Sequence, residues 1–194
     1  MATAVDMPKV AAVALPLETV FRAHYASVLR SAFRITGSMA DAEDVTQATF
    51  LRLARGDLDE GQVRDMGGYL RRAAVNAALD VLRSRRVRAQ VPIEDDSFPS
   101  HSQASPEQEQ SSAELRQRLR EALAKLHPRT AEMFALRYME GLDNPEVAQM
   151  MKTSQAVVAV TLHRARSRLR KELRAFSTSE ERPCLEKSTT NSIR

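Results

Sequence analysis

The sequence predicts an all-α protein with two small helical domains joined by a flexible acidic linker. Apolar side chains recur at spacings of three and four residues in several segments, and no alternating strand pattern lies between them. The eight prolines and six glycines fall at expected helix starts or between the periodic segments. Residues 91–112 contain several acids and no lysine or arginine, which is typical of a linker. We therefore expect a disordered leader at 1–16, domains at 17–90 and 113–176, and a polar tail at 177–194.

The composition narrows the possible partners and activities. A net charge of +4 is modest for 194 residues, but the basic residues cluster in two predicted helices, which favours a polyanionic partner. The single cysteine, Cys184, excludes an intramolecular disulfide and fits a reducing compartment. No export signal or membrane span is expected, so we expect a cytoplasmic protein. The four histidines are scattered without metal-ligand or nucleophile spacing, which argues against an enzyme and against a metal or other cofactor.

The first domain is expected to begin with a helix over residues 17–35, which Gly37 ends. The apolar side chains of this helix recur on one face, as a helix packed against a core requires. They are Phe21, Tyr25, Val28, Leu29 and Ala32.

A second helix is expected from Ser38 to Arg55, and its two faces differ. The face expected to be buried carries Ala42, Val45, Thr49 and Leu53, and the opposite face carries Asp44, Gln47, Ala48 and Leu51. Acids in a first turn, such as Asp41 and Asp44, complement the helix dipole, so the outer face is consistent with a simple solvated surface. The outward Leu51 beside Gln47 instead favours a docking surface, and the residues alone leave both interpretations open.

A loop and a basic helix complete the first domain. The loop, Gly56 to Gly68, is long for a helical domain and is a candidate recognition loop. In the helix expected from Tyr69 to Gln90, one face is apolar, whereas the other carries Arg72, Asn76, Arg83 and Arg86. Arginine binds phosphate and asparagine hydrogen-bonds base edges, so this face is either a nucleic-acid site or a solvated surface. Tyr69 would either stack on an unpaired base or close the core.

Two further helices are expected between the linker and the most informative segment of the chain. Ser105-Pro106-Glu107 is typical of a helix start, and that helix is expected to reach Leu126. Its inward residues are Leu115, Leu119, Ala122, Leu123 and Leu126. The next helix is expected from Pro128 to Glu140, and Gly141 ends it.

Residues 143–173 have the pattern of a helix-turn-helix. Asp143-Asn144-Pro145-Glu146 predicts a capping box, with Val147, Ala148 and Met151 on the apolar side of a short helix. Lys152-Thr153 forms the turn and Ser154 caps a second helix. The apolar stripe of this second helix is expected to be Val158, Leu162, Ala165, Leu169, Leu173 and Phe176. Its opposite face carries small side chains, His163 and several arginines, which suits a DNA major groove better than a solvated surface.

Three motifs in this order resemble the extracytoplasmic-function sigma factors, the minimal group of the sigma-70 family. They are Asp41-Ala-Glu-Asp-Val-Thr-Gln, the pattern Tyr69-Leu70-x-x-Ala73-x-x-Asn76-x-x-x-Asp80-x-x-Arg83, and Leu126 to Met133 leading into Glu146-Val-Ala and Leu162-His-Arg-Ala-Arg. The resemblance covers about residues 17–176. It implies a region 2 domain, a linker that passes through polymerase, and a region 4 domain. The implied partners are core RNA polymerase, promoter DNA and an anti-sigma factor.

The resemblance also assigns roles to particular residues. The docking face, which would bind polymerase, consists of Asp41, Asp44, Gln47 and Leu51. The minus-ten face, beside a loop that captures a flipped base, consists of Tyr69, Arg72, Asn76, Arg83 and Arg86. The minus-thirty-five face consists of Ser154, Gln155, Ala159, Val160, His163, Arg164 and Arg166.

Some residues depart from the family pattern. Ala159, Val160 and Thr161 stand where basic and small polar residues are common, so apolar contacts with thymine methyl groups are expected to replace some hydrogen bonds. Ala48 stands where glutamate is usual, and Tyr69 where tryptophan is usual. The alternative to a sigma factor is a stand-alone helix-turn-helix regulator that does not enter polymerase.

Overall fold

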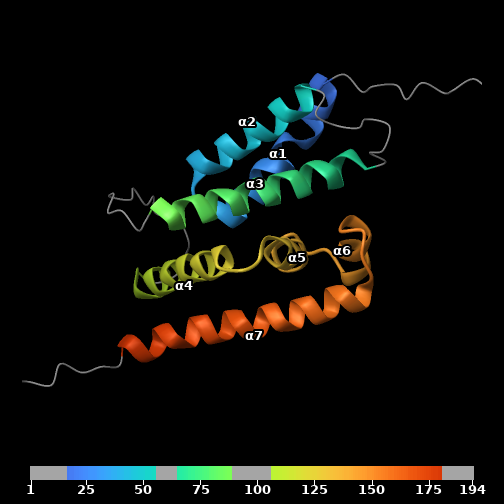
Figure 1. The fold of residues 1–194 in the computed structure, drawn as a ribbon. Helices are drawn as coiled ribbons and strands as arrows, with labels where there is room; N and C mark the ends of the chain where they lie inside the picture. The colour runs from blue at the N-terminus through green and yellow to red at the C-terminus, as the bar shows by residue number, and fades with distance from the viewer. Residues whose placement is uncertain (1–16, 56–64, 89–105, 181–194) are drawn as a thin grey trace, which may run out of the picture.

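The computed structural model describes residues 17–55, 65–88 and 106–180, and every element within these ranges is a helix. The predicted all-α class is therefore confirmed. The helices form three layers (Figure 1). The first contains α1 (Leu17–Thr36), α2 (Met39–Ala54) and α3 (Met66–Arg88), and the second contains α4 (Pro106–Ala124) and α5 (Pro128–Tyr138). The third is α7 (Gln155–Glu180), with the short α6 (Asn144–Met150) at one end.

Helices α1, α2 and α3 all contact one another, and their buried side chains form one part of an apolar core that continues into the other two layers. Val28, Ala32 and Ile35 of α1 are fully buried in it. The side chain of Ser38 accepts from the Asp41 backbone N–H and caps α2. The two faces predicted for α2 are confirmed, since Ala42, Val45 and Thr49 are buried and Leu53 is partly buried, whereas Asp44, Gln47, Ala48 and Leu51 are exposed. Phe21 was expected inside but is 41% exposed at the edge of α1, where its ring contacts Tyr25 and Phe50.

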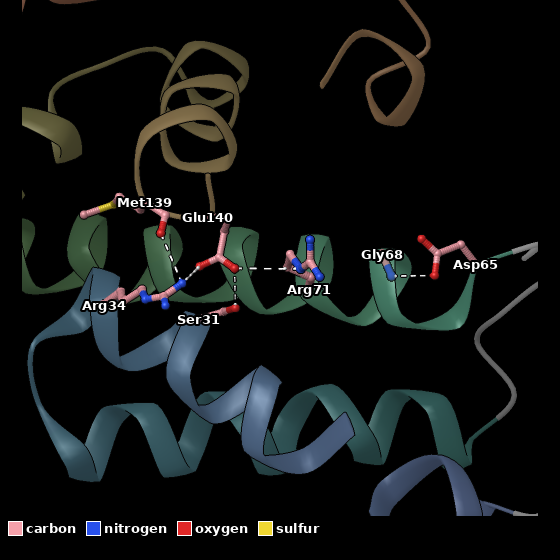
Figure 2. Close-up of polar contacts among 7 residues, drawn as sticks. All are labelled: Ser31, Arg34, Asp65, Gly68, Arg71, Met139 and Glu140. Atoms are coloured by element: carbon pink, nitrogen blue, oxygen red, sulfur yellow. Dashed lines mark hydrogen bonds and ion pairs between the residues drawn. The ribbon is translucent and has the colours of Figure 1, made fainter. Parts of the chain in front are cut away.

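Helix α3 begins earlier than the sequence suggests. The loop was expected to reach Gly68, but Met66, Gly67 and Gly68 are helical. Asp65 explains the difference, because its Oδ1 accepts a hydrogen bond from the Gly68 backbone N–H at 3.0 Å and so satisfies a free donor of the first turn (Figure 2). Two adjacent glycines usually interrupt helices, and here the cap at Asp65 offsets that preference.

The second and third layers share a core built from α4, α5, α6 and α7. Leu123, Met133, Leu136, Val147 and Val158 are almost completely buried in it. Lys125, just after α4, donates through Nζ to Glu172 Oε2 of α7 at 2.6 Å, and this bond holds the pKa of Glu172 below its ordinary value. Leu115 was expected to face inward, but it is 57% exposed because it lies in the part of α4 before the buried segment that ends at Leu126.

The helix-turn-helix has the predicted boundaries at its start and a longer second helix. The Asp143 side chain accepts from the Glu146 backbone N–H at 2.8 Å, and Glu146 Oε2 accepts from the Asp143 N–H at 2.6 Å, which confirms the capping box. Helix α7 continues to Glu180, beyond the end expected at 176, because no proline or glycine lies between Gln155 and Pro183.

Several expectations fall outside the described residues. They are the leader at 1–16, loop residues 56–64, linker residues 91–105, the side chain of Phe176, and the tail from 181 with Cys184. The last seven residues assigned to the linker, 106–112, belong to α4.

The two halves of the chain contact each other through α3. Helix α3 packs on α1 and α2 on one side, and on α4 and α5 on the other. This position explains why Leu70, Val75, Ala78, Leu79 and Leu82 are all buried, although one apolar stripe was expected. The sequence did not predict this contact between the halves.

Candidate nucleic-acid interface

The outer face of α7 is open to solvent along its first half. Ala159, Val160, His163 and Arg164 are all exposed, and Val160 is 51% exposed. Val158, Leu162, Ala165 and Leu169 point the other way and are buried against the core. Gln155 and Arg166 are also exposed. The face therefore combines small and apolar side chains with cations, a combination that fits base edges flanked by phosphates.

The turn before α7 fixes the direction of this face. Lys152 has a φ of +49°, and its N–H and that of Thr153 donate to the carbonyls of Gln149 and Ala148, which closes the end of α6 in a Schellman motif. Ser154 then caps α7, because its Oγ accepts from the Val157 N–H at 3.3 Å. Ser154 and Gln155 lie at the start of α7, where DNA-contacting residues of helix-turn-helix proteins are usually found.

At the centre of the minus-ten face, Arg72 and Asn76 form hydrogen bonds with the second half of the chain. Arg72 Nε donates to Glu132 Oε1 of α5 at 2.6 Å, and Asn76 Nδ2 donates to the same oxygen at 3.0 Å. Arg72 also donates through a terminal nitrogen to the carbonyl of Met150, at 2.8 Å. Both side chains are half-buried. The structure therefore brings the two residues together, but against a carboxylate of the same chain.

The other residues of the minus-ten face have different surroundings. Arg83 forms an ion pair with Asp80 at 2.6 Å within α3, whereas its other guanidinium nitrogens are buried without a hydrogen-bond partner. Arg86 is exposed and is one of the cations that lower the pKa of Glu172, after Lys125. Tyr69 is partly buried and packs against the core. That environment is consistent with both roles weighed for Tyr69.

Helix α2, which carries the docking face, lies on the side of the first layer away from α5 (Figure 1). Asp44, Gln47 and Leu51 are exposed, and Leu51 is 53% exposed. Asp41 differs from them, because its carboxylate pairs with Arg85 of α3 at 2.6 Å and its side chain is only 19% exposed. Three of the four residues are therefore available to a partner, whereas Asp41 holds α2 to α3.

Sequence reasoning missed two acids, Glu132 and Glu140, that contact the first layer. Glu140 lies just after α5, and its Oε2 accepts from Ser31 Oγ at 2.7 Å; Arg34 and Arg71 lie within 3.5 and 3.8 Å of its carboxylate (Figure 2). Glu132 is 7% exposed and stands inside an otherwise apolar segment, residues 131–136. A lone acid in such a segment indicates a partner elsewhere in the fold, because buried carboxylates are almost always paired.

Two negative observations concern the described ranges alone. Residues 17–55, 65–88 and 106–180 contain no cluster of three or more histidine, cysteine or acidic side chains suited to a metal ion. No helix in those ranges is both long and apolar enough to cross a membrane.

The chain matches two protein families over separate segments. Residues 20–88, which span α1 to α3, match the family described as sigma-70 region 2. Residues 116–169, from α4 into α7, match the family described as sigma-70, region 4.

Relatives among characterised proteins extend over most of the chain. It is 34% identical over 159 residues to the ECF RNA polymerase sigma factor SigE of Mycolicibacterium smegmatis, covering 81% of this chain and 61% of that protein. The chain therefore spans about three-fifths of the length of that relative. It is 30% identical over 179 residues to the RNA polymerase sigma-E factor of Streptomyces avermitilis, covering 88% of this chain and 96% of that protein.

A solved structure has the same fold. The structure of CnrH in complex with the cytosolic domain of CnrY matches with a TM-score of 0.50 at 20% identity, covering 82% of this chain and 88% of that chain. Both domain families and the relatives over nearly full length lead to one assignment. The chain belongs to the extracytoplasmic-function sigma factors of the sigma-70 family.

Proposed function

We propose that the protein is a promoter-specificity subunit that binds core RNA polymerase and directs transcription initiation, without catalysis of its own. The observation that carries this proposal is that both sigma-70 domains occur in one chain and in order, with the docking face and the minus-thirty-five face both exposed. A bacterial polymerase is found in the cytoplasm, so the proposal also places the protein there. An anti-sigma partner remains a prediction of the family resemblance.

The docking face is proposed to bind polymerase through Gln47 and Leu51, with Asp44 beside them. An apolar side chain exposed among polar ones gains stability when a partner removes it from water. Leu51 is suited to that role because it is 53% exposed and lies on a helix whose other face is fixed in the core. Asp41 acts in this proposal as a residue that positions α2, through its ion pair with Arg85.

The minus-thirty-five face is proposed to enter the major groove. Ala159 and Val160 would contact thymine methyl groups, and His163 and Arg164 would donate to base edges or phosphates. Arg166 and the arginines that follow it on α7, Arg168 and Arg170, are exposed and would neutralise phosphates beside the groove. Ser154 and Gln155 would contact the DNA backbone at the start of the helix.

The minus-ten face is proposed to bind the melted strand. Asn76 has an amide that can pair with a base edge, whereas Arg72, Arg83 and Arg86 supply cations for the phosphates. Tyr69 lies at the start of α3, next to the loop whose residues 56–64 are outside the described ranges. Extruding a base costs a few kcal/mol, so several such contacts are required together.

Reconstitution with core polymerase tests the proposal. The purified chain should co-elute with core enzyme and start transcripts at discrete sites on genomic DNA. Leu51→Asp should weaken binding to core enzyme, whereas Leu115→Asp, at a leucine that is 57% exposed on α4, should not. A chain that fails to bind core enzyme, yet binds duplex DNA tightly alone, would instead be a stand-alone helix-turn-helix regulator.

A further inference from the structure

We propose that the free chain keeps its minus-ten face closed with its own second domain, so that Glu132 and DNA compete for the same donors. The proposal rests on the proposed function, because it takes Arg72 and Asn76 as contacts to the minus-ten element. The interdomain contact is defined here by Glu132 with Arg72 and Asn76, and by Glu140 with Ser31, Arg34 and Arg71.

Glu132 occupies the groups that DNA would need. Its Oε1 accepts from Arg72 at 2.6 Å and from Asn76 at 3.0 Å, so one carboxylate oxygen receives both a guanidinium and an amide donor. A phosphate oxygen or a base acceptor on a single strand would compete with Glu132 for these two side chains, which the second domain half-buries. Full access of DNA to both side chains therefore needs Glu132 to move away.

Glu140 makes a second contact two residues beyond the end of α5. Its carboxylate lies between α1 and α3, where it meets Ser31, Arg34 and Arg71 (Figure 2). The Glu140 side chain is only 4% exposed although it is charged. Glu132 on α5 and Glu140 just after α5 are thus two nearly buried acids that face a basic surface on the first domain. Opposite charges on the two sides are typical of a specific contact.

Arginines also bind the ends of helices across this contact. Arg72 donates to the carbonyl of Met150, the last residue of α6, and Arg34 donates to the carbonyl of Met139, which caps α5, at 3.2 Å. Arg120 of α4 donates to the Ile35 carbonyl in the last turn of α1, also at 3.2 Å. Cations are favourable at helix C-termini, where carbonyls lack partners within the helix. The contact therefore supplies hydrogen-bond donors to backbone carbonyls at helix ends in both domains.

The contact also buries apolar side chains of α3 against α4 and α5, and its ion pairs are the part that can exchange partners on opening. A buried ion pair gains little over other arrangements, because removing both charges from water offsets much of their attraction. Arg72 and Asn76 can exchange Glu132 for a phosphate or base and remain hydrogen-bonded, whereas the freed carboxylates regain water. Each side thus has an alternative partner in the open state.

The closed arrangement cannot contact both promoter elements. The positions minus ten and minus thirty-five differ by about 25 base pairs, which is about 85 Å of helix axis at about 3.4 Å per base pair. Packed helices lie about 8–10 Å apart, so α3 and α7, with only the middle layer between them, are about 20 Å apart. Helix α7 itself is about 39 Å long, from 26 residues at 1.5 Å each. The domains must therefore separate before both faces contact one promoter.

The docking face remains available in the closed form. Leu51 is exposed on α2, whereas the second domain covers the opposite side of α3 (Figure 1). Core polymerase can therefore bind the closed chain first, and the energy of seating the second domain on polymerase can separate the halves. The expected order is core binding, opening, and then contact with DNA.

The test removes the charge of Glu132 and leaves the DNA-contacting residues unchanged. Glu132→Gln keeps an acceptor of the same shape, and Glu121→Gln is the matched control, because Glu121 is exposed on α4 and its hydrogen bond from Gln117 is within that helix. Fluorophores at Glu43→Cys and Ser167→Cys, in a Cys184→Ser background, report the distance between the domains by energy transfer. Unlabelled chains are titrated with short single-stranded DNA of random sequence.

The expected result is lower energy transfer and about tenfold tighter DNA binding for Glu132→Gln, a change equivalent to about 1.4 kcal/mol. The apparent affinity rises because it is limited by the fraction of open chain. Added salt should lower energy transfer in the wild-type chain more than in Glu132→Gln, since screening weakens the charged contact. Glu121→Gln should match the wild type in each assay.

Two results overturn the proposal. Unchanged energy transfer and DNA affinity in a folded Glu132→Gln chain would show that no closed state limits binding. Weaker DNA binding in that chain would make Glu132 a support for the minus-ten face. If Glu132→Gln loses helical content, Glu140→Gln is tested in its place with the same expectations. If the wild-type chain does not initiate transcription with core polymerase, the proposed function fails instead, whatever the energy transfer shows.

Discussion

Replacing Asp143 with alanine should destabilise the helix-turn-helix by a predictable amount. Asp143 accepts a hydrogen bond from the Glu146 N–H at 2.8 Å at the start of α6. Loss of such a cap costs about 1 kcal/mol, within a range of about 0.5–2 kcal/mol. The lost charge near the helix N-terminus adds about 0.3–1 kcal/mol. Together these effects predict a decrease of about 1.5 kcal/mol in the free energy of unfolding.

Thermal unfolding followed by calorimetry or circular dichroism measures this change. Each kcal/mol corresponds to about 4–8 °C in Tm if the second domain unfolds alone, and to about 2–4 °C if the whole chain unfolds as one unit. The size of the shift therefore also reports whether the interdomain contact couples the two halves.

Asp143→Asn is the matched control, because asparagine caps helices about as well as aspartate. It should keep most of the stability that alanine loses. Equal losses in both variants, or no loss in Asp143→Ala, would refute the assignment of the stabilisation to the cap.

Three further predictions concern the proposed minus-thirty-five and minus-ten faces and pH. Arg164→Ala should weaken minus-thirty-five-dependent initiation by about 1–3 kcal/mol if Arg164 contacts a base, and should lower the salt dependence if it holds a phosphate; unchanged promoter use would contradict its role. Asn76→Ala should leave core binding intact while open-complex formation, followed by permanganate footprinting, decreases; a loss of core binding would show that Asn76 acts elsewhere. Glu172→Gln should lower stability at pH 7 by less than about 1 kcal/mol. The bond from Lys125 lowers the pKa of Glu172, so this difference should be complete above about pH 4.3 and should be lost as the pH falls further, through the lowered pKa of Glu172. A difference that persists once Glu172 is protonated would exclude the ionised pair as its cause.

Local patterns predicted much of the fold. The capping box at Asp143 and the two faces of α2 depend on residues within one or two turns of each other, and the structure confirms both. The predicted start of α3 was wrong because Gly67 and Gly68 suggested a loop, whereas the cap from Asp65 allows a helix. The prediction that Leu115 faces inward was wrong because the helical spacing of apolar residues extends beyond the part of α4 that is packed.

The contact between the halves was not predictable from such patterns. Glu132 is bonded to Arg72, which lies 60 residues earlier in the chain, so no local spacing relates the two. Arg72 and Asn76 were assigned to DNA because their side chains suit it, and the structure shows that the same donors also suit a carboxylate. The roles of the candidate DNA-binding and polymerase-binding residues therefore remain predictions that the variants above will test.

Gly37 influences more than the end of α1. Its φ is +71°, and a β-carbon added there would occupy the space taken by the guanidinium of Arg120, which would have to leave the Ile35 carbonyl. Burial, with Arg116 and Arg85 nearby, already holds the pKa of Arg120 below its ordinary value, because the charged guanidinium is poorly solvated. In the proposed closed form, a side chain at position 37 would therefore weaken the contact between the halves without changing any residue of the minus-ten or minus-thirty-five face.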